Sequence, residues 1–270
     1  MKKIIIMALA AIAFLQLQGQ DFSKFEAKSV TKDGHTLVYR ILWPEKMKKG
    51  EKYPIVLFMH GLGKRGTDNE QQLDRGADIW LKAENRAKYP CIVIYPQTPK
   101  EFFEVVNDGT VETGSFSAWT KTTDKSKVSI RLSPYGQMTY DVVQDLIKSG
   151  VADTDRLYIG GSSMGGFSTF QFITMYPDMW AAAIPIASST DVSTIGKWAG
   201  KIPVWMINGE NDKPETVANN KLLREKMKQM GIGEDYFKYT IYPGVGHGSW
   251  GKAFQEPDFI PYLFRHTKKK

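Results

Sequence analysis

The sequence predicts an α/β fold with one mostly parallel central sheet and helices on both of its faces. Short runs that are apolar on both faces recur along the chain, and segments with helical periodicity separate several of them. Of the 270 residues, 42% are hydrophobic and 24% are charged, which is an ordinary globular balance. Continuous apolar runs are typical of strands buried in a parallel sheet, and their alternation with helices implies crossovers that cover both faces.

The apolar runs predict the strands in chain order. A hairpin around the turn Lys32-Asp33-Gly34 comes first, and six apolar runs follow it. Helical periodicity indicates helices around 140–147, 167–174 and 215–230. The predicted strands are 25–30, 35–42, 54–59, 91–95, 157–159, 181–186, 202–207 and 237–242.

The amino terminus is typical of an export signal. Positive residues at 2–3 precede an apolar run over 4–17, which is shorter than the roughly 20 residues that a membrane span needs. We therefore expect a signal peptide over 1–20. We also expect a single domain over 21–270, because no repeat and no Pro-, Gly- or Ser-rich linker divides these residues. The expected location is the periplasm or the outside of the cell, without a stable membrane anchor after cleavage.

Charge and cysteine content exclude several functions. The formal net charge is +7, but five lysines lie at the extreme ends of the chain, at 2–3 and 268–270, so a nucleic-acid groove is not expected. Cys91 is the only cysteine and lies in an apolar run, which excludes an internal disulfide and a multi-thiolate metal site. No metal site is predicted.

One motif marks a candidate nucleophile. Residues 161–165 read Gly-Ser-Ser-Met-Gly, a G-x-S-x-G pattern between a predicted strand and a helical segment. A serine between strand and helix sits in a sharp, strained turn, where flanking glycines avoid crowding. The helix start directs its free N–H groups and the positive end of its dipole at the reaction centre. Ser163 is therefore the candidate nucleophile.

A serine hydroxyl needs a base, and the chain has four histidines. His35 lies far upstream beside a turn, His60 precedes the nucleophile in a glycine loop, and His266 lies in the basic tail. His247 follows the last predicted strand in a glycine-rich segment, so elimination favours it as the base.

The base in turn needs a carboxylate, and the chain order Ser, acid, His places it between 163 and 247. Asp212 is best placed, in a loop after the strand 202–207. Ligands and catalytic groups gather at the carboxyl ends of strands in such sheets. Asp191, Glu210 and Glu215 remain alternatives.

The oxyanion of an acyl-transfer intermediate needs backbone N–H donors. We predict Met164, the residue after the nucleophile, and Leu62, in the glycine loop 60–63. The same loop spells G-x-G-x-x-G over 61–66, but without a ribose-binding acid and a helix in register this does not indicate a dinucleotide site.

One long polar stretch, 98–134, does not fit the alternation of strands and helices. Loops of this length in compact domains are usually functional or disordered. We expect this insertion to flank the cleft at Ser163 and to contact substrate through Trp119. Trp250, close to His247, is a second candidate for a substrate contact.

Five stretches, 60–69, 95–97, 153–166, 208–212 and 246–247, carry a family resemblance. On these stretches the chain resembles the α/β-hydrolases. More narrowly, it resembles the bacterial phospholipase/carboxylesterase and polyhydroxybutyrate-depolymerase-like group, which includes family 1 carbohydrate esterases such as feruloyl and acetylxylan esterases.

The resemblance implies a serine esterase that needs no cofactor. Only residues 187–201 separate the fourth and fifth apolar runs, a gap too short for a separate lid domain. The expected substrates of the esterase are small-molecule or carbohydrate-borne carboxylic esters, with feruloyl or acetyl groups on plant-type polysaccharides first. Gln97 is a further candidate substrate contact. Two alternatives stay open: a serine peptidase like the prolyl oligopeptidases, and a non-catalytic glycan-binding module on a hydrolase scaffold.

Overall fold

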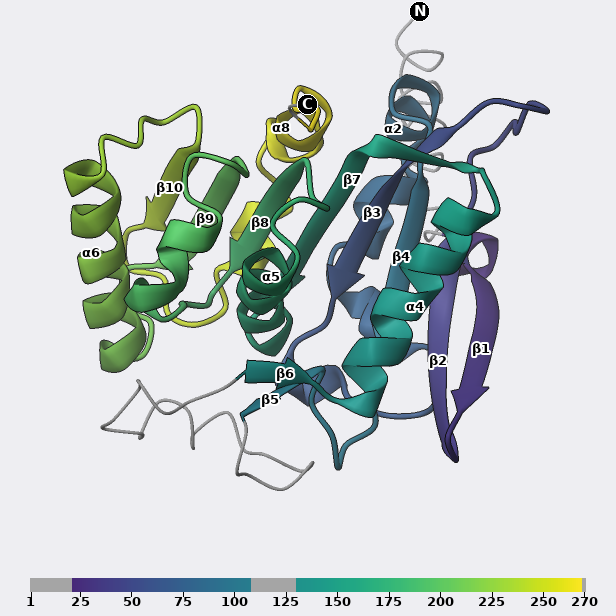
Figure 1. Cartoon of the computed structure of the whole chain (residues 1–270), viewed down its shortest axis with the longest axis horizontal. Helices are drawn as coiled ribbons and strands as arrows, with labels where there is room; N and C mark the ends of the chain where they lie inside the picture. The colour runs from purple at the N-terminus through teal and green to yellow at the C-terminus, as the bar shows by residue number, and fades with distance from the viewer. Residues whose placement is uncertain (1–20, 108–129, 269–270) are drawn as a thin grey trace, which may run out of the picture.

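The computed structural model describes residues 21–107 and 130–268, and an eight-stranded sheet forms its centre (Figure 1). The strand order is β1-β2-β4-β3-β7-β8-β9-β10. The neighbours from β4 to β10 are parallel, and only β1 with β2 and β2 with β4 are antiparallel. The predicted mostly parallel sheet is therefore confirmed. Its strands are β1 (Glu26–Lys32), β2 (His35–Leu42), β3 (Tyr53–Met59), β4 (Ile92–Gln97), β7 (Ala152–Ser162), β8 (Ala182–Ile186), β9 (Val204–Gly209) and β10 (Phe237–Tyr242).

Both faces of the sheet are buried, because alternate residues of each strand enter two separate cores. In β3, Ile55 and Leu57 belong to one core, and Val56 and Phe58 belong to the other. Helices α4, α5 and α6 supply the first core, and α8 with the 3₁₀ helix η4 supplies the second (Figure 1).

The α-helices are α2 (Ala83–Lys88), α4 (Pro134–Lys148), α5 (Met164–Met175), α6 (Pro214–Gln229), α7 (Trp250–Ala253) and α8 (Phe259–Phe264). The 3₁₀ helices are η1 (Phe22–Lys24), η2 (Leu62–Lys64), η3 (Gln71–Asp74), η4 (Ala77–Leu81) and η6 (Val192–Lys197).

Two elements are longer than the sequence predicted. The strand expected over 157–159 runs from Ala152 to Ser162, since pairing with β3 and β8 holds polar and glycine residues that carry no apolar signal. The helix expected around 140–147 already begins at Pro134. Ser133 caps it, its hydroxyl accepting a hydrogen bond from the N–H of Gly136 at 3.1 Å. A Ser-Pro pair at a helix start is the signal that the periodicity alone missed.

The predicted insertion 98–134 is described over 98–107 and 130–134. Its two short strands, β5 (Val105–Asn107) and β6 (Ile130–Leu132), form an antiparallel ribbon. The ribbon lies at the edge where the parallel strands end, near the start of α4 (Figure 1). Trp119 and the predicted signal peptide 1–20 lie outside the described residues.

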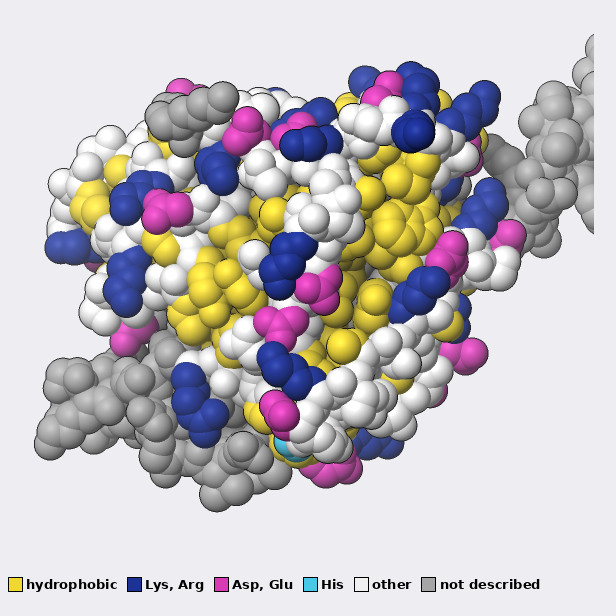
Figure 2. Space-filling view, turned by 45° about the vertical axis from the view of Figure 1, so that its right-hand side comes forward, with side chains coloured by type: hydrophobic (Ala, Val, Ile, Leu, Met, Phe, Trp, Pro, Cys, Tyr) yellow, Lys and Arg dark blue, Asp and Glu magenta, His cyan; other side chains and the backbone are white. Residues whose placement is uncertain are grey.

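Acidic and basic side chains are intermixed on the face drawn in Figure 2. This face offers no extended basic patch of the kind that a nucleic-acid partner needs. Within 21–107 and 130–268, no helix combines the length and apolarity that a bilayer crossing requires. In the same residues, no group of three or more His, Cys, Asp or Glu side chains is arranged to hold a metal ion.

Candidate active site

The turn between β7 and α5 holds Ser163 in a strained backbone conformation, with φ +56° and ψ −111°. Few non-glycine residues adopt a positive φ, and such strain persists only where the surroundings enforce it. The surroundings here are backbone atoms. A Cβ on Gly165 would lie 2.2 Å from the carbonyl oxygen of Met59, and one on Gly161 would lie 2.4 Å from that of Gly165. The two motif glycines therefore allow the turn to press against the end of β3.

Three side chains meet above this turn in a chain of hydrogen bonds. The Ser163 Oγ lies 2.8 Å from Nε2 of His247, and His247 Nδ1 lies 2.8 Å from Oδ1 of Asp212. The carboxylate accepts the Nδ1–H, which fixes the tautomer and leaves Nε2 free to accept the serine proton. The structure thus brings together the three residues that the sequence selected as nucleophile, base and acid.

Adjacent loops after β9 and β10 set this alignment. Gly209 ends β9, and a Cβ there would lie 2.2 Å from the carbonyl oxygen of Gly246. The N–H of Asn211 donates to the carbonyl oxygen of Val245 at 2.8 Å. The loop that carries Asp212 and the loop that carries His247 are therefore joined through their backbones.

Asp212 lies in a site that keeps it charged. Burial by itself would raise the pKa of its carboxyl group, but hydrogen bonds from His247 and from the backbone N–H of Lys213 outweigh burial and hold the pKa below its ordinary value. A charged Asp212 stabilises the imidazolium that forms when His247 takes a proton.

The alternative acids have other partners. Glu210 accepts the N–H of Gly244 at 2.8 Å and so steadies the loop that leads to His247. Asp191 caps η6 by accepting the N–H of Ser193 at 2.8 Å. Glu215 lies exposed in the first turn of α6.

The glycine loop after β3 passes directly over the nucleophile. A Cβ on Gly61 would lie 3.6 Å from the Cβ of Ser163 and 3.4 Å from the carbonyl oxygen of Ser162. Leu62, the next residue, is therefore beside Ser163. Met164 is the first residue of α5, where backbone N–H groups have no partner within the helix. Both predicted oxyanion donors thus lie next to Ser163. The side chain of Leu62 is 44% exposed, so this residue contributes to the site through its backbone and little to the core through its side chain.

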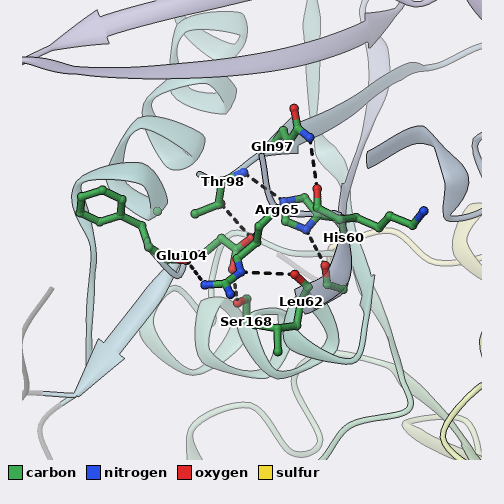
Figure 3. A network of polar contacts seen from close by, with 12 residues as sticks. His60, Leu62, Arg65, Gln97, Thr98, Glu104 and Ser168 are labelled. Atoms are coloured by element: carbon green, nitrogen blue, oxygen red, sulfur yellow. Dashed lines mark hydrogen bonds and ion pairs between the residues drawn. The ribbon is translucent and has the colours of Figure 1, made fainter. Parts of the chain in front are cut away.

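A buried polar network below this loop was not predicted from the sequence (Figure 3). His60 is fully buried and bonds through Nδ1 to the carbonyl oxygen of Gly61 at 2.9 Å. Its Nε2 accepts the backbone N–H of Thr98 at 3.0 Å, so the ring is neutral and has no proton for Glu104, 3.9 Å away. Burial lowers the pKa of His60, in agreement with this assignment. His60 is a structural residue and not the base.

The candidate substrate contacts differ in their outcome. Gln97 is fully buried, and its amide bonds within the protein to Asn69, Lys64 and Asp68. This geometry does not favour the predicted contact of Gln97 with substrate, because its polar atoms hold the loop that follows the glycine turn.

The ring of Trp250, in contrast, lies edge-on to the His247 ring with centroids 5.4 Å apart. Trp250 also lines a cavity of about 730 Å³, together with Arg75, Tyr89 and Phe254. Trp250 therefore borders both the His247 ring and this cavity, although His247 and Ser163 do not line the cavity. Trp119 lies outside the described residues.

Known proteins are similar to this chain in sequence or in fold. The model of the prolyl oligopeptidase family matches residues 139–205, which include the serine turn. Among solved structures, a thermostable esterase is 29% identical with a TM-score of 0.78, and the match covers 92% of this chain. The chain spans 64% of that esterase's length. A search of curated proteins finds no match.

Two further structures are similar in fold alone. The match to a feruloyl esterase module from Clostridium thermocellum, complexed with sinapinate, has 17% identity, a TM-score of 0.61 and coverage of 91% of this chain and 89% of that one. The match to the acylaminoacyl peptidase of Pyrococcus horikoshii has 18% identity and a TM-score of 0.56, and covers 96% of this chain and 44% of that one.

The contact of Gly165 with β3 can be tested by adding a methyl group. In Gly165→Ala, the new Cβ would meet the Met59 carbonyl at 2.2 Å, and backbone cannot move aside as a flexible side chain can. We expect a loss of about 2–3 kcal/mol or more in the free energy of unfolding, measured by urea denaturation. Gly251→Ala in α7 is the control, since nothing lies within 4 Å of its Cβ, and it should be neutral or slightly stabilising. Equal effects of the two variants would contradict the close contact.

The charge on Asp212 predicts a pH-dependent stability difference. Its pKa is lower in the folded chain than in the unfolded chain, so the ionised group stabilises the fold above the unfolded pKa, and this contribution disappears as the pH falls through the folded pKa. Asp212→Asn should therefore be less stable than the wild type by about 1–2 kcal/mol near neutral pH. The difference should shrink in acid, as the pH falls below the ordinary aspartate pKa of about 3.9 and through the lower pKa of the folded state.

Thermal unfolding at both pH values measures this effect. Glu215→Gln removes an exposed carboxylate from the same region, leaves the pair with His247 intact and should follow the wild type at both values. A deficit of Asp212→Asn that is equally large in acid would show that the charge of Asp212 is not what stabilises the site.

Proposed function

Because the chain has an α/β-hydrolase fold, we propose that it is an exported serine esterase that hydrolyses carboxylic esters through an acyl-enzyme intermediate. One observation carries the proposal: an unbroken chain of hydrogen bonds runs from Ser163 through His247 to the buried Asp212. Strained backbone conformations cluster at active sites, so the positive φ of Ser163 supports a chemical role for this turn.

In the proposed acylation, Ser163 Oγ attacks the ester carbonyl carbon while His247 Nε2 takes the hydroxyl proton. The carbonyl oxygen becomes an oxyanion, which accepts hydrogen bonds from the N–H groups of Leu62 and Met164. When the intermediate collapses, the bond from carbon to the alcohol oxygen breaks, and His247 gives its proton to the departing alcohol. The acyl group is then an ester of Ser163.

Deacylation repeats these steps with water in place of serine. His247 takes a proton from water, the hydroxide attacks the acyl carbon, and the proton returns to Ser163 as the carboxylic acid leaves. Asp212 holds the ring in the same tautomer in both halves. Each step uses only side chains, backbone N–H groups and water, so the mechanism requires no cofactor.

Esters are favoured over peptides as substrates by the similarity to the thermostable esterase, which extends over 92% of the chain. The match to the prolyl oligopeptidase family over 139–205 supports a serine peptidase as the second candidate. The same three side chains could serve both reactions, since the two differ chiefly in the leaving group that His247 must protonate.

The substrate class that we propose is an acyl group, feruloyl or acetyl, on a plant-type polysaccharide or its oligosaccharides. It rests on the resemblance to family 1 carbohydrate esterases and on the aromatic ring of Trp250 beside His247. Trp250 lies edge-on to the His247 ring, and a flat ring of this kind suits contact with a sugar or an aromatic acyl group. Export of the chain would bring it to such polymers outside the cell.

Removal of the Ser163 hydroxyl tests the reaction. Ser163→Ala should lower kcat/KM for p-nitrophenyl acetate about a thousandfold or more, because no other group can form the acyl intermediate. Ser162→Ala is the matched control. The Ser162 hydroxyl is buried without a hydrogen-bond partner among the described residues, so its loss should change kcat/KM little. Unchanged hydrolysis by Ser163→Ala would refute the esterase.

A substrate panel in the same assay separates the candidate functions. Methyl ferulate, acetylated xylan, acetylated glucose and aminoacyl amides are compared at equal concentration. Ferulate or acetyl release that Ser163→Ala abolishes supports the proposed function. Cleavage of amides without esters favours the peptidase, and binding to xylan without any hydrolysis favours a glycan-binding module.

A further inference from the structure

A buried carboxylate lies below the catalytic turn and takes no part in the reaction described above. The Glu104 side chain is fully buried, and its two oxygens accept hydrogen bonds from different elements. Oε1 accepts the hydroxyl of Thr98 at 3.0 Å, and Oε2 accepts the hydroxyl of Ser168 at 3.1 Å (Figure 3). A carboxylate is rarely buried in this way unless charge and hydrogen bonds compensate it.

Arg65 supplies the nearby positive charge. Burial lowers the pKa of its guanidinium, and the charge of Glu104 opposes this effect. The guanidinium is also fixed in place: Nε donates to the carbonyl oxygen of Leu62 at 3.3 Å, and Nη1 donates to that of Phe102 at 3.1 Å. The cation further lies 4.8 Å from the centre of the Phe103 ring. Arg65 thus connects the segment that carries Glu104 to the loop over Ser163.

The peptide between Gly61 and Leu62 is held from its other side. Its carbonyl oxygen accepts Nδ1–H of His60, whose Nε2 accepts the N–H of Thr98. A peptide unit is planar and trans, so fixing the direction of the Gly61 carbonyl also fixes the direction of the Leu62 N–H. The hydroxyl of Thr98 is in turn bonded to Glu104.

Glu104 is therefore linked, through its partners, to both halves of the proposed oxyanion site. Thr98 links it, through His60, to the Gly61 carbonyl, which precedes the Leu62 N–H. Arg65 links it to the Leu62 carbonyl, which follows that N–H. Through Ser168 it reaches α5, the helix whose first residue is Met164. Among the described residues, no other carboxylate accepts hydrogen bonds from both Thr98 and α5.

We propose that Glu104 is a positioning residue that holds the N–H groups of Leu62 and Met164 in the relative geometry that an oxyanion requires. It does not touch substrate. Its charge keeps Arg65 on the Leu62 carbonyl. Its two hydrogen bonds tie α5 to Thr98, whose N–H in turn bonds to His60 in the loop after β3. The inference deepens the proposed function and rests on it.

Glu104→Gln tests the charge with little change in shape. The Thr98 and Ser168 hydroxyls can each donate or accept, so both hydrogen bonds can survive while the attraction to Arg65 is lost. We expect kcat for p-nitrophenyl acetate to fall about 10- to 100-fold with little change in KM, because a small misplacement of donors weakens the transition state and not the bound ester. Glu101→Gln is the matched control: its carboxylate also attracts Arg65 but is exposed, so solvent and salt screen this attraction, and the variant should keep full activity.

A trifluoromethyl ketone gives a readout that a purely structural role would not move. Ser163 Oγ adds to its carbonyl carbon, His247 takes the serine proton, and the resulting oxyanion sits on the Leu62 and Met164 N–H groups as in the reaction. Its affinity for Glu104→Gln should fall by the same factor as kcat/KM, measured on folded enzyme counted by active-site titration. Unchanged inhibitor affinity, or equal losses in Glu101→Gln, would overturn the proposal.

A second variant keeps the test decisive if Glu104→Gln does not fold. Arg65→Lys retains the positive charge but lacks the forked donor that bonds both Leu62 and Phe102. It should weaken the trifluoromethyl ketone about 10-fold or more, and full affinity would overturn the proposal. Failure of this inference can be distinguished from failure of the proposed function. If the proposed function were wrong, Ser163→Ala would hydrolyse the ester as the wild type does.

Discussion

The backbone of Ser163 is the constraint on which the rest of the site depends. A positive φ at a non-glycine residue is unfavourable, so the turn must be enforced by its neighbours. Gly161 and Gly165 allow the turn to press against the end of β3, and the N–H of Ser163 donates to the carbonyl oxygen of Ile186 at 2.8 Å. The hydroxyl is thereby raised above the sheet edge, where His247 reaches it and where the loop at Leu62 passes over it.

Convergence at this edge follows from parallel strands that end together. β3, β7, β9 and β10 each deliver one functional segment there: the glycine loop, the serine turn, the acid loop and the histidine loop. Backbone contacts then couple these segments in pairs. The acid loop is joined to the histidine loop through Asn211 and Val245, and the glycine loop is joined to α5 through the network around Glu104. A site with few reactive side chains thus depends on many backbone positions.

Much of this arrangement could be predicted from the sequence because it leaves local signals. The apolar runs gave the strands, the serine motif gave the turn, and chain order with elimination selected His247 and Asp212. Side-chain networks leave no such signal. Glu104 lies in a segment that reads as a polar insertion, and nothing local shows that its side chain is fully buried against Ser168. The burial of Gln97 leaves no local signal either, since its partners lie near 64–69 in the chain.

The central claim is that Ser163 is an activated nucleophile, and its reaction with a fluorophosphonate tests this most directly. Mass spectrometry of the treated wild-type protein should show the mass of one probe, and peptide mapping should place it on Ser163. Asp212→Asn should react far more slowly, because the hydrogen bond that orients His247 is altered. Labelling at any other residue, or no labelling of folded protein, would contradict the account.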